Sequence, residues 1–261
     1  MKKYRFCGLQ IETTSHPSEN LKKIKALFNR ASRAEPDFVV LPEMFEIAPV
    51  PSEASGYSHP IPSQLTDTLG ELAREHSVNL IGGSFFEEED HRIYNTAVVF
   101  DREGRICGKY RKIHLFDAFG YGESDYITRG QTPFVYELDG LRFGVAICYD
   151  VRFPEIFRLY AAEGAQVVFV PAAYFQPNHD HWHLNIRSRA LDNTIFVMSS
   201  NQTGKRFVGR SMTANPWGIS IASMGIEEGY YMVEIDVDII GKTRKKLPFL
   251  ENMQFKVSPS T

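Results

Sequence analysis

The chain has 261 residues, of which 43% are hydrophobic, 13% aromatic and 23% charged. This content of apolar and aromatic residues excludes an intrinsically disordered protein, and three cysteines are too few for a disulfide scaffold. The 29 lysines and arginines against 32 aspartates and glutamates leave a formal net charge of −3. No positive excess is therefore available to neutralise phosphates, and we expect no nucleic-acid partner. The odd number of cysteines favours a reducing compartment.

Neither the N-terminal stretch nor the longest apolar stretch has the length of a targeting or membrane segment. The stretch 7–11 contains Gln10 and is followed at once by Glu12, which makes it too short for the apolar region of a signal peptide. Residues 167–175 include Pro171 and fall far short of the roughly 20 residues that span a bilayer. We therefore expect a cytoplasmic protein with no membrane partner.

Short apolar runs alternate with amphipathic segments along the chain. In 20–33 the apolar residues recur three and four positions apart, which predicts a helix with one buried face. The patterns predict, in chain order, a strand over 4–11, a helix over 20–33, a strand over 38–41, a helix over 65–75, strands over 79–84, 94–101 and 142–148, a helix over 155–163, a strand over 167–170, a helix over 183–193, a strand over 195–199, and then strand and turn to 236. Helices that alternate with fully apolar strands predict an α/β fold in which helices cover a sheet.

We expect a single domain over residues 1–261, because no change of composition and no internal repeat marks a boundary. The segment from about 242 to the end is basic and contains proline. We expect it to form an extended C-terminal tail.

Cys148 has the sequence context of a nucleophile. It ends the apolar run 143–147, and a polar turn follows it before Pro154 begins a helix. Reactive groups in α/β folds lie at the carboxyl ends of strands, where backbone N–H groups of the next helix can stabilise a thiolate or an oxyanion and lower the pKa of a thiol. The alternative is a small buried hydrophobic residue. Cys7 and Cys107 lack this context, and we expect both to serve packing.

Two further residues could act with this thiol. Glu43 follows the apolar run 38–41 directly, so its carboxylate is a candidate base, although an exposed carboxylate fits the same pattern. Lys112 shares one face of an extended segment with His114, and an inward ammonium needs a negative partner that a thiolate and a glutamate could supply. The alternative is a solvated basic face. Glu123 lies in a glycine-rich loop and is unremarkable by itself.

Three segments together resemble the signatures of a known family. Residues 41–43, 110–115 and 148–155 resemble, in order and spacing, the three signature segments of the nitrilase superfamily of carbon–nitrogen hydrolases. The resemblance continues through the segments 181–182, 187–193, 201–204 and 215–218, so it covers nearly the whole chain.

This resemblance implies a four-layer α-β-β-α sandwich, assembly into a homodimer or a larger homo-oligomer, and a Glu–Lys–Cys triad without metal or cofactor. Cys148 attacks the amide carbonyl carbon, and Glu43 takes the thiol proton and later activates water. Lys112 and the backbone N–H of Tyr149 form the oxyanion hole. Glu123 matches a second glutamate that positions the substrate and keeps Lys112 charged.

The residues after the nucleophile favour one branch of the superfamily. The segment 148–155, Cys-Tyr-Asp-x-Arg-Phe-Pro-Glu, is similar to the corresponding segment of amidases related to Nit proteins and ω-amidases. Nitrilases usually carry Trp-Glu after the cysteine, and carbamoyl-amide hydrolases tend to carry Asn there. We therefore expect hydrolysis of a small aliphatic amide, ω-amides included, to acid and ammonia through a cysteine thioester. The alternatives are hydrolysis of an N-carbamoyl amide or a nitrile, and a non-catalytic interaction protein that kept the fold.

An ω-amidase needs a cation for the distal carboxylate of its substrate. Arg152, Arg187 and Arg189 are the candidates, and internal ion pairs with Glu155 or Asp192 are the alternative for each of them.

Two other patterns in the sequence have some features of ligand sites. His179, His181 and His183 alternate and could bind a metal if extended, but the segment leads into a predicted helix, where positions two apart do not face each other. The glycines of 82–84 and 204–205 lack the spacing of a P-loop. We expect no metal and no cofactor.

Overall fold

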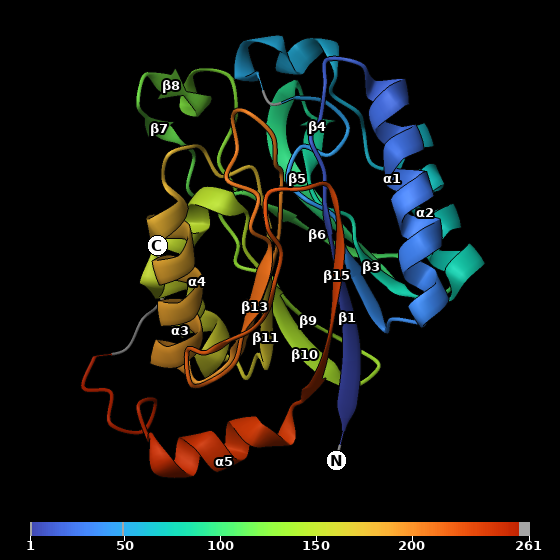
Figure 1. Ribbon diagram of the computed structural model, residues 1–261. Coiled ribbons are helices and arrows are strands. Elements are labelled where there is room, and N and C mark those ends of the chain that lie inside the picture. Colours follow the sequence, from blue (N-terminus) through green and yellow to red (C-terminus); the bar gives the residue numbers. More distant parts are fainter. Residues whose placement is uncertain (1, 49, 256–261) are drawn as a thin grey trace.

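The computed structural model describes residues 2–48 and 50–255, and two β-sheets form its centre (Figure 1). The strands of the first sheet are β1 (Lys3–Gln10), β2 (Phe38–Val40), β3 (Asn79–Ile81), β4 (Phe85–Glu89), β5 (Arg92–Phe100), β6 (Ile106–Arg111) and β15 (Gly229–Asp236). Their order is β15-β1-β2-β3-β5-β4, with β6 paired to β5. The strands of the second sheet are β9 (Val135–Leu138), β10 (Leu141–Val145), β11 (Val167–Ala172), β12 (Phe196–Asn201), β13 (Met212–Ala214) and β14 (Ser220–Ser223), in the order β14-β13-β12-β11-β10-β9.

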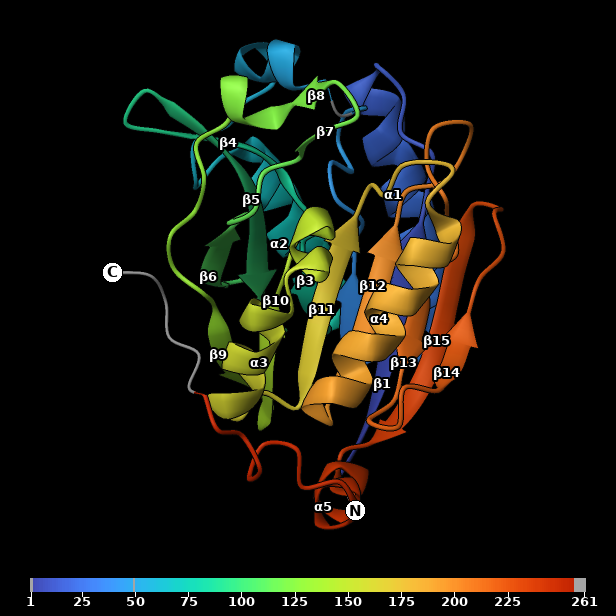
Figure 2. The same cartoon turned by 90° about the vertical axis from the view of Figure 1, so that its left-hand side faces the viewer.

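Helices cover the outer face of each sheet. The helices are α1 (Pro17–Ala31), α2 (Gln64–His76), α3 (Pro154–Ala162), α4 (His179–Asn193) and α5 (Asp238–Lys246). Figures 1 and 2 show α1 and α2 against the first sheet and α3 and α4 against the second. The short elements are η1 (Ser32–Ala34), η2 (Pro51–Gly56), η3 (Glu123–Asp125) and η4 (Cys148–Arg152), which are 3₁₀ turns, and the hairpin β7 (Asp117–Ala118) with β8 (Tyr121–Gly122). The predicted four-layer α-β-β-α sandwich is therefore confirmed.

The inner faces of the two sheets are joined by a cluster of buried aromatic rings. Phe38 of the first sheet lies 5.8 Å from Phe143 and 5.7 Å from Phe169 of the second, measured between ring centroids. Phe6 lies 5.5 Å from Phe169, and all four side chains are fully buried. Burial of each such ring stabilises the fold by about 1.5–3 kcal/mol, and edge-to-face contacts add to this.

The helices form for local reasons as well as through packing. In α1 the buried apolar residues Ile24, Leu27, Phe28 and Ala31 recur three and four apart, and Pro17 occupies the first turn, where no N–H is needed. Helix α2 begins with a capping box, in which the Ser63 side chain accepts from Thr66 N and the Thr66 hydroxyl accepts from Ser63 N.

Parallel strands bring the candidate site residues to one edge of the sandwich. Strands β1, β2 and β3 run parallel, as do β10, β11 and β12. Glu43 follows β2, and Cys148 follows β10. The carboxyl ends of parallel strands meet at the same edge of a sheet, and here the edges of both sheets face each other at the end of the molecule that carries β7 and β8 (Figure 1).

Several element boundaries differ from those predicted; for example, α1 begins at Pro17 and β3 ends at Ile81. The strand expected over 142–148 ends at Val145, and Cys148 lies in the turn η4 instead. Helix α4 begins at His179, four residues earlier than expected. The tail expected to be extended from about 242 is helical through Lys246, because Ile240 and Thr243 are buried and the basic last turn suits the C-terminal end of a helix dipole. Residues 256–261 of that tail lie outside the described part of the chain.

Within residues 2–48 and 50–255, no helix is both long and apolar enough to cross a membrane.

Candidate active site

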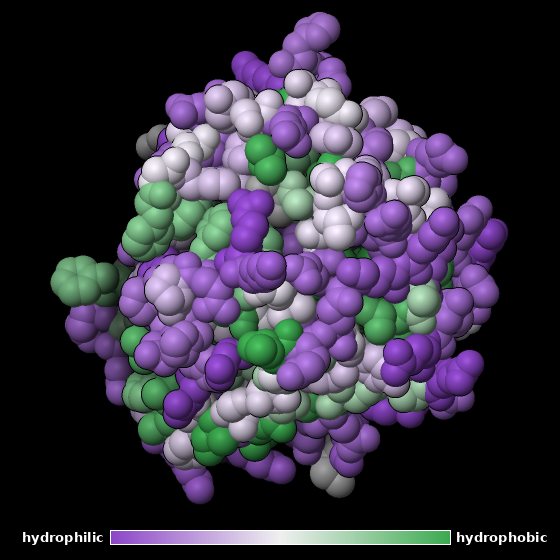
Figure 3. All heavy atoms as spheres, turned by 45° about the horizontal axis from the view of Figure 1, so that its top comes forward, coloured by the Kyte–Doolittle hydropathy of each residue, from purple (hydrophilic) through white to green (hydrophobic). Residues whose placement is uncertain are grey.

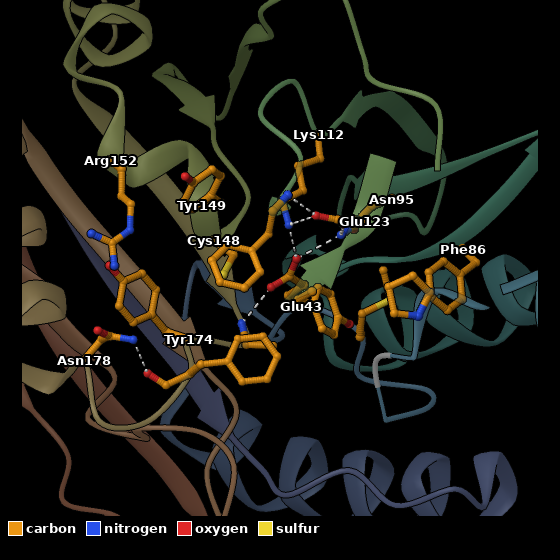
Figure 4. Close-up of a pocket in the computed structure, with 16 residues that line it drawn as sticks. Glu43, Phe86, Asn95, Lys112, Glu123, Cys148, Tyr149, Arg152, Tyr174 and Asn178 are labelled. Atoms are coloured by element: carbon orange, nitrogen blue, oxygen red, sulfur yellow. Dashed lines mark hydrogen bonds and ion pairs between the residues drawn. The ribbon is translucent and has the colours of Figure 1, made fainter. Parts of the chain in front are cut away.

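Four of the predicted site residues meet in one pocket between the two sheets (Figure 4). Glu43 comes from the loop after β2, Lys112 from the end of β6, Glu123 from η3 and Cys148 from η4. Their exposed fractions are 4%, 3%, 4% and 8%, in the same order. The structure thus brings together residues that are far apart along the chain and withdraws all four from water.

Lys112 is the centre of a buried ion cluster. Its Nζ donates to Glu43 Oε1 at 2.9 Å and to Glu123 Oε2 at 2.8 Å. Burial acts to lower the pKa of Lys112, but the charges of Glu123 and Glu43 prevail and raise it well above its usual value. The side chain therefore remains an ammonium, and a cation is available where an oxyanion would form.

The Glu43 carboxylate is held by groups from both sheets. Its Oε2 accepts from the backbone N–H of Ala173, just after β11, at 2.8 Å. Gln202 Nε2 donates to the backbone oxygens of Glu43 and Met44 at 2.8 and 2.9 Å. The carboxylate lines the same pocket as the thiol of Cys148, and its charge is one of the causes that raise the pKa of that thiol. These bonds hold the Glu43 carboxylate in the pocket that also contains Cys148.

Asn95, on β5, belongs to the site although the sequence did not point to it. Its Nδ2 donates to Glu43 Oε1 at 2.8 Å and to Glu123 Oε1 at 3.1 Å, and the residue is 1% exposed. Its backbone oxygen accepts from Lys112 N at 2.8 Å, so it lies beside the lysine on the neighbouring strand. The available signal was an amide side chain inside a run of apolar strand residues.

The state of the Cys148 thiol differs from the one expected from its neighbouring N–H groups. Burial and the charge of Glu43 raise its pKa well above the usual value, while Lys112 acts in the opposite direction. The expected lowering of the thiol pKa is wrong, because desolvation of a buried thiolate raises this pKa by more than the N–H groups of the turn η4 lower it. The resting thiol is therefore protonated, and a nucleophilic role for the sulfur would require a base that takes its proton. The residue also has a positive φ of 46°, an uncommon conformation outside glycine.

Aromatic and apolar side chains form most of the pocket wall. The lining residues besides the ion cluster and the nucleophile are Met44, Pro51, Phe86, Phe116, Tyr121, Tyr149, Arg152, Ala173, Tyr174, Phe175 and Asn178. Phe116 stacks on Phe175 at 5.5 Å and meets Tyr149 edge-on at 5.0 Å, measured between ring centroids. Such walls suit the short apolar chain of a small substrate. Around this end of the molecule, apolar residues form small groups on a mostly hydrophilic surface (Figure 3).

Of the three candidate arginines, only Arg152 lines the pocket. Its guanidinium lies 5.2 Å from the ring centroid of Tyr174, and no carboxylate pairs with it among the described residues. Arg189 donates to Val151 O and Arg152 O and lies 4.0 Å from Asp192. These contacts within the protein match the alternative of an internal ion pair. Arg187 donates to the backbone oxygen of Gly218, outside the pocket.

The histidines of the alternating pattern all lie on α4. Within the described ranges, no group of three or more His, Cys, Asp or Glu side chains could hold a metal ion.

Known proteins resemble this chain over most of its length. The family model for carbon–nitrogen hydrolases matches residues 5–245. The omega-amidase NIT2 of Xenopus tropicalis is 34% identical over 259 residues, which are 95% of this chain and 94% of that protein. The 2-oxoglutaramate amidase of Bacillus subtilis is 34% identical over 250 residues, which are 91% of this chain and 92% of that protein.

A solved structure shows the same likeness in three dimensions. Nit3 of Saccharomyces cerevisiae, a member of branch 10 of the nitrilase superfamily, aligns with a TM-score of 0.90 at 29% identity over 97% of both chains. The fold, the buried Glu–Lys–Cys cluster and these relatives agree: the chain belongs to the carbon–nitrogen hydrolase family, within the nitrilase superfamily.

Proposed function

We propose that the protein is a cysteine-dependent amidase that hydrolyses the terminal amide of a short ω-amide, giving a dicarboxylic acid and ammonia. The observation that carries the proposal is the buried cluster of Glu43, Lys112 and Cys148 in a pocket that also holds Arg152. The likeness to an omega-amidase and to a 2-oxoglutaramate amidase supports the same substrate class.

In the first half-reaction, the sulfur of Cys148 attacks the amide carbonyl carbon while the thiol proton passes to Glu43. The carbonyl oxygen becomes an oxyanion that Lys112 Nζ and the backbone N–H of Tyr149 stabilise. The C–N bond then breaks as Glu43 returns the proton to the leaving nitrogen. Ammonia departs and a thioester on Cys148 remains.

In the second half-reaction, a water molecule attacks the thioester carbon while Glu43 accepts one of its protons. The C–S bond breaks, the carboxylic acid is released, and the proton returns to the sulfur. One water is consumed for each ammonia formed. Glu43 serves as base and acid in both halves, and its place in the same pocket as Cys148 supports this role.

Glu123 and Asn95 act on the other members of the cluster. Glu123 Oε2 accepts from Lys112 Nζ at 2.8 Å and from Phe116 N at 2.7 Å, so it anchors the ammonium to the pocket wall. Asn95 donates to both carboxylates and keeps them at a fixed separation. Both residues thereby hold Lys112 where the oxyanion forms.

Arg152 recognises the distal carboxylate of the substrate. Its guanidinium is part of the pocket wall. A substrate carboxylate that is buried in the pocket needs a positively charged partner such as this group. An aliphatic chain between the amide and the carboxylate would lie against the aromatic walls.

The test is ammonia release from a substrate panel by purified protein, with Cys148→Ala as the blank. We expect the monoamides of succinic and glutaric acid and 2-oxoglutaramate to exceed butyramide in kcat/KM by roughly tenfold or more, because a buried ion pair contributes to binding. Faster turnover of N-carbamoyl compounds with release of carbon dioxide, or of nitriles, would replace the proposed substrate class. No ammonia from any compound would overturn the amidase function.

We also propose that the protein assembles as a homodimer or a larger homo-oligomer. Leu184 of α4 is 67% exposed, and Trp217, Ile219 and Ile221 near the same helix are 37%, 55% and 40% exposed. An apolar surface of this kind is typical of an interface. Light scattering coupled to gel filtration tests the assembly, and a monomer at micromolar concentration would contradict it.

A cytoplasmic location is the third proposal. All three cysteines are free, and Cys148 must remain a thiol to act as a nucleophile. Cell fractionation tests it, and recovery outside the cytoplasm would contradict it.

A further inference from the structure

We propose that Asp150 is a positioning residue that ties the strand end carrying Lys112 to the turn carrying Cys148, and so sets the separation of the ammonium and the sulfur during the reaction. This inference rests on the proposed function of these two residues. It concerns a carboxylate that touches neither the substrate nor the reacting atoms.

Asp150 is fully buried, and its carboxylate accepts four hydrogen bonds. Oδ2 accepts from the Tyr110 hydroxyl at 2.7 Å and from the backbone N–H of Ile147 at 2.8 Å. Oδ1 accepts from the backbone N–H of His114 at 2.9 Å and pairs with His114 Nδ1 at 2.7 Å. Burial and the charge of Asp150 raise the pKa of Tyr110 well above its usual value, so the tyrosine is protonated and donates.

The donors flank both catalytic residues. Tyr110 and His114 lie two positions before and two positions after Lys112, and Ile147 directly precedes Cys148. One carboxylate thus holds each end of the lysine segment and the residue that leads into the nucleophile. A shift of Asp150 would move Lys112 and Cys148 relative to each other.

The turn at Cys148 needs such an anchor. Strand β10 ends at Val145, so Ile147 N has no partner in the sheet, and a buried N–H without a partner costs free energy. Cys148 also holds its positive φ only if the neighbouring residues restrain it. The bond from Ile147 to Asp150 satisfies the N–H and restrains the turn.

Tyr110, His114 and Asp150 form a clamp between the two segments. The histidine of this clamp is itself held in place. Its ring stacks on Phe153 with centroids 3.7 Å apart and planes 7° apart, and Phe153 follows η4. His114 is therefore held between Asp150 and the end of the same turn. Tyr110, His114 and Asp150 therefore form a second hydrogen-bonded network, in which Tyr110 and Asp150 are buried and His114 is partly exposed.

Glu87 offers a matched control. It is also fully buried, and it also binds β6, through Lys109 Nζ at 2.5 Å and Arg111 Nη2 at 2.7 Å. Its side-chain hydrogen bonds within the described residues go to Thr96, Lys109 and Arg111, and none of these residues belongs to the turn η4. Glu87→Gln thus removes an equally buried charge beside the same strand and leaves the link to Cys148 intact.

The experiment compares Asp150→Asn with Glu87→Gln and the unaltered protein. The asparagine side chain has the size of aspartate, but its NH₂ group is a donor and would face the hydrogen-bond donors that surround Asp150. We expect kcat per active site of Asp150→Asn to fall roughly tenfold or more, since small misplacements of reacting groups are costly, with KM changed less than about threefold. For Glu87→Gln we expect kcat within about twofold. Active sites are counted by labelling Cys148 and mapping the peptide by mass spectrometry.

A second readout needs no substrate. The pH profile of Cys148 alkylation by iodoacetamide should move to higher pH in Asp150→Asn, because a displaced ammonium stabilises the thiolate less. If the unaltered protein hydrolyses no amide, the proposed function fails, while the alkylation profile still reports on the clamp.

Three outcomes overturn the inference: an unchanged kcat with an unchanged alkylation profile in Asp150→Asn, a rise in KM alone, or an equal loss of kcat in Glu87→Gln. If Asp150→Asn does not fold, Tyr110→Phe and His114→Ala replace it, each removing one donor. Each should then lower kcat by about threefold or more, and unchanged kcat in both overturns the inference.

Discussion

Lys112 Nζ lies 2.9 Å from Glu43 Oε1, although 69 residues separate the two along the chain. Both side chains are nearly inaccessible to water, with exposed fractions of 3% and 4%. Burial of an unpaired charge costs several kcal/mol, and the pairing of the ammonium with the carboxylate offsets this cost. In the proposed mechanism, this pair supplies the base and the ammonium that stabilises the oxyanion beside Cys148.

Glu43→Gln should abolish hydrolysis and at the same time make Cys148 easier to alkylate. The glutamine cannot accept the thiol proton, so we expect kcat to fall by roughly a thousandfold or more. After burial, the charge of Glu43 is the next cause of the high pKa of Cys148, so its removal should move the alkylation profile to lower pH. Iodoacetamide labelling across pH, followed by peptide mapping, measures this. A profile that stays in place would contradict the role of Glu43 in holding the thiol protonated.

Lys112→Met should destabilise the fold as well as inactivate the enzyme. It leaves the carboxylates of Glu43 and Glu123 buried without their cation, and breaking a buried pair in this way costs about 3–5 kcal/mol. Urea unfolding at pH 7 measures the loss. The double variant Lys112→Met/Glu123→Gln should regain part of the stability but none of the activity. A single variant as stable as the unaltered protein would refute the electrostatic account.

Asn95→Ala should lower kcat by roughly tenfold, because two carboxylates lose the amide that holds them apart. Asn95→Asp should be worse than alanine, since it adds a third negative charge to the cluster. Asn79→Ala is the matched control: Asn79 is also 1% exposed but bonds to Asp139, outside the site. It should reduce thermal stability and leave kcat unchanged. Equal kcat losses in Asn95→Ala and Asn79→Ala would argue against a special role for Asn95.

Arg152→Met should change substrate preference more than turnover. We expect KM for a succinic acid monoamide to rise roughly tenfold or more, while kcat/KM for uncharged butyramide stays within about threefold. Arg187→Met serves as control, because Arg187 bonds to Gly218 O outside the pocket and its loss should leave the ratio between the two substrates unchanged. Steady-state assays of ammonia release measure both. An unaltered ratio in Arg152→Met would remove Arg152 from substrate recognition.

His59 should make stability depend on pH near neutrality. Its Nε2 lies 2.9 Å from Glu46 Oε2, and this hydrogen bond is the main cause that raises the pKa of His59, against the effect of burial. A raised pKa means that the stabilisation is fully present below the unfolded-state value of about 6.5 and is lost as pH rises through the folded-state value. The difference in unfolding free energy between the unaltered protein and His59→Gln should therefore be larger at pH 6 than at pH 9. Urea titrations at the two pH values test this, and a constant difference would contradict it.

Much of the fold follows from local pattern. The helix α1 and the strand β2 were predictable, because apolar residues mark the buried faces of both segments. These residues are spaced three and four apart in 20–33 and form a continuous run at 38–41. The boundaries of η4 and α5 were not. Cys148 leaves its strand because Asp150 takes the N–H of Ile147, and α5 persists because two of its side chains are buried by the rest of the molecule.

The sequence by itself determined which residues are candidates for the chemistry: Glu43, Lys112 and Cys148, with Glu123, stand in motifs whose order and spacing resemble one family. Only the tertiary structure decided that Asn95 joins them, that Arg152 alone of three arginines lines the pocket, and that the thiol rests in its protonated form. The physical reason is that a motif records local backbone and residue type, whereas hydrogen bonds across strands and the degree of desolvation depend on which distant segments pack together.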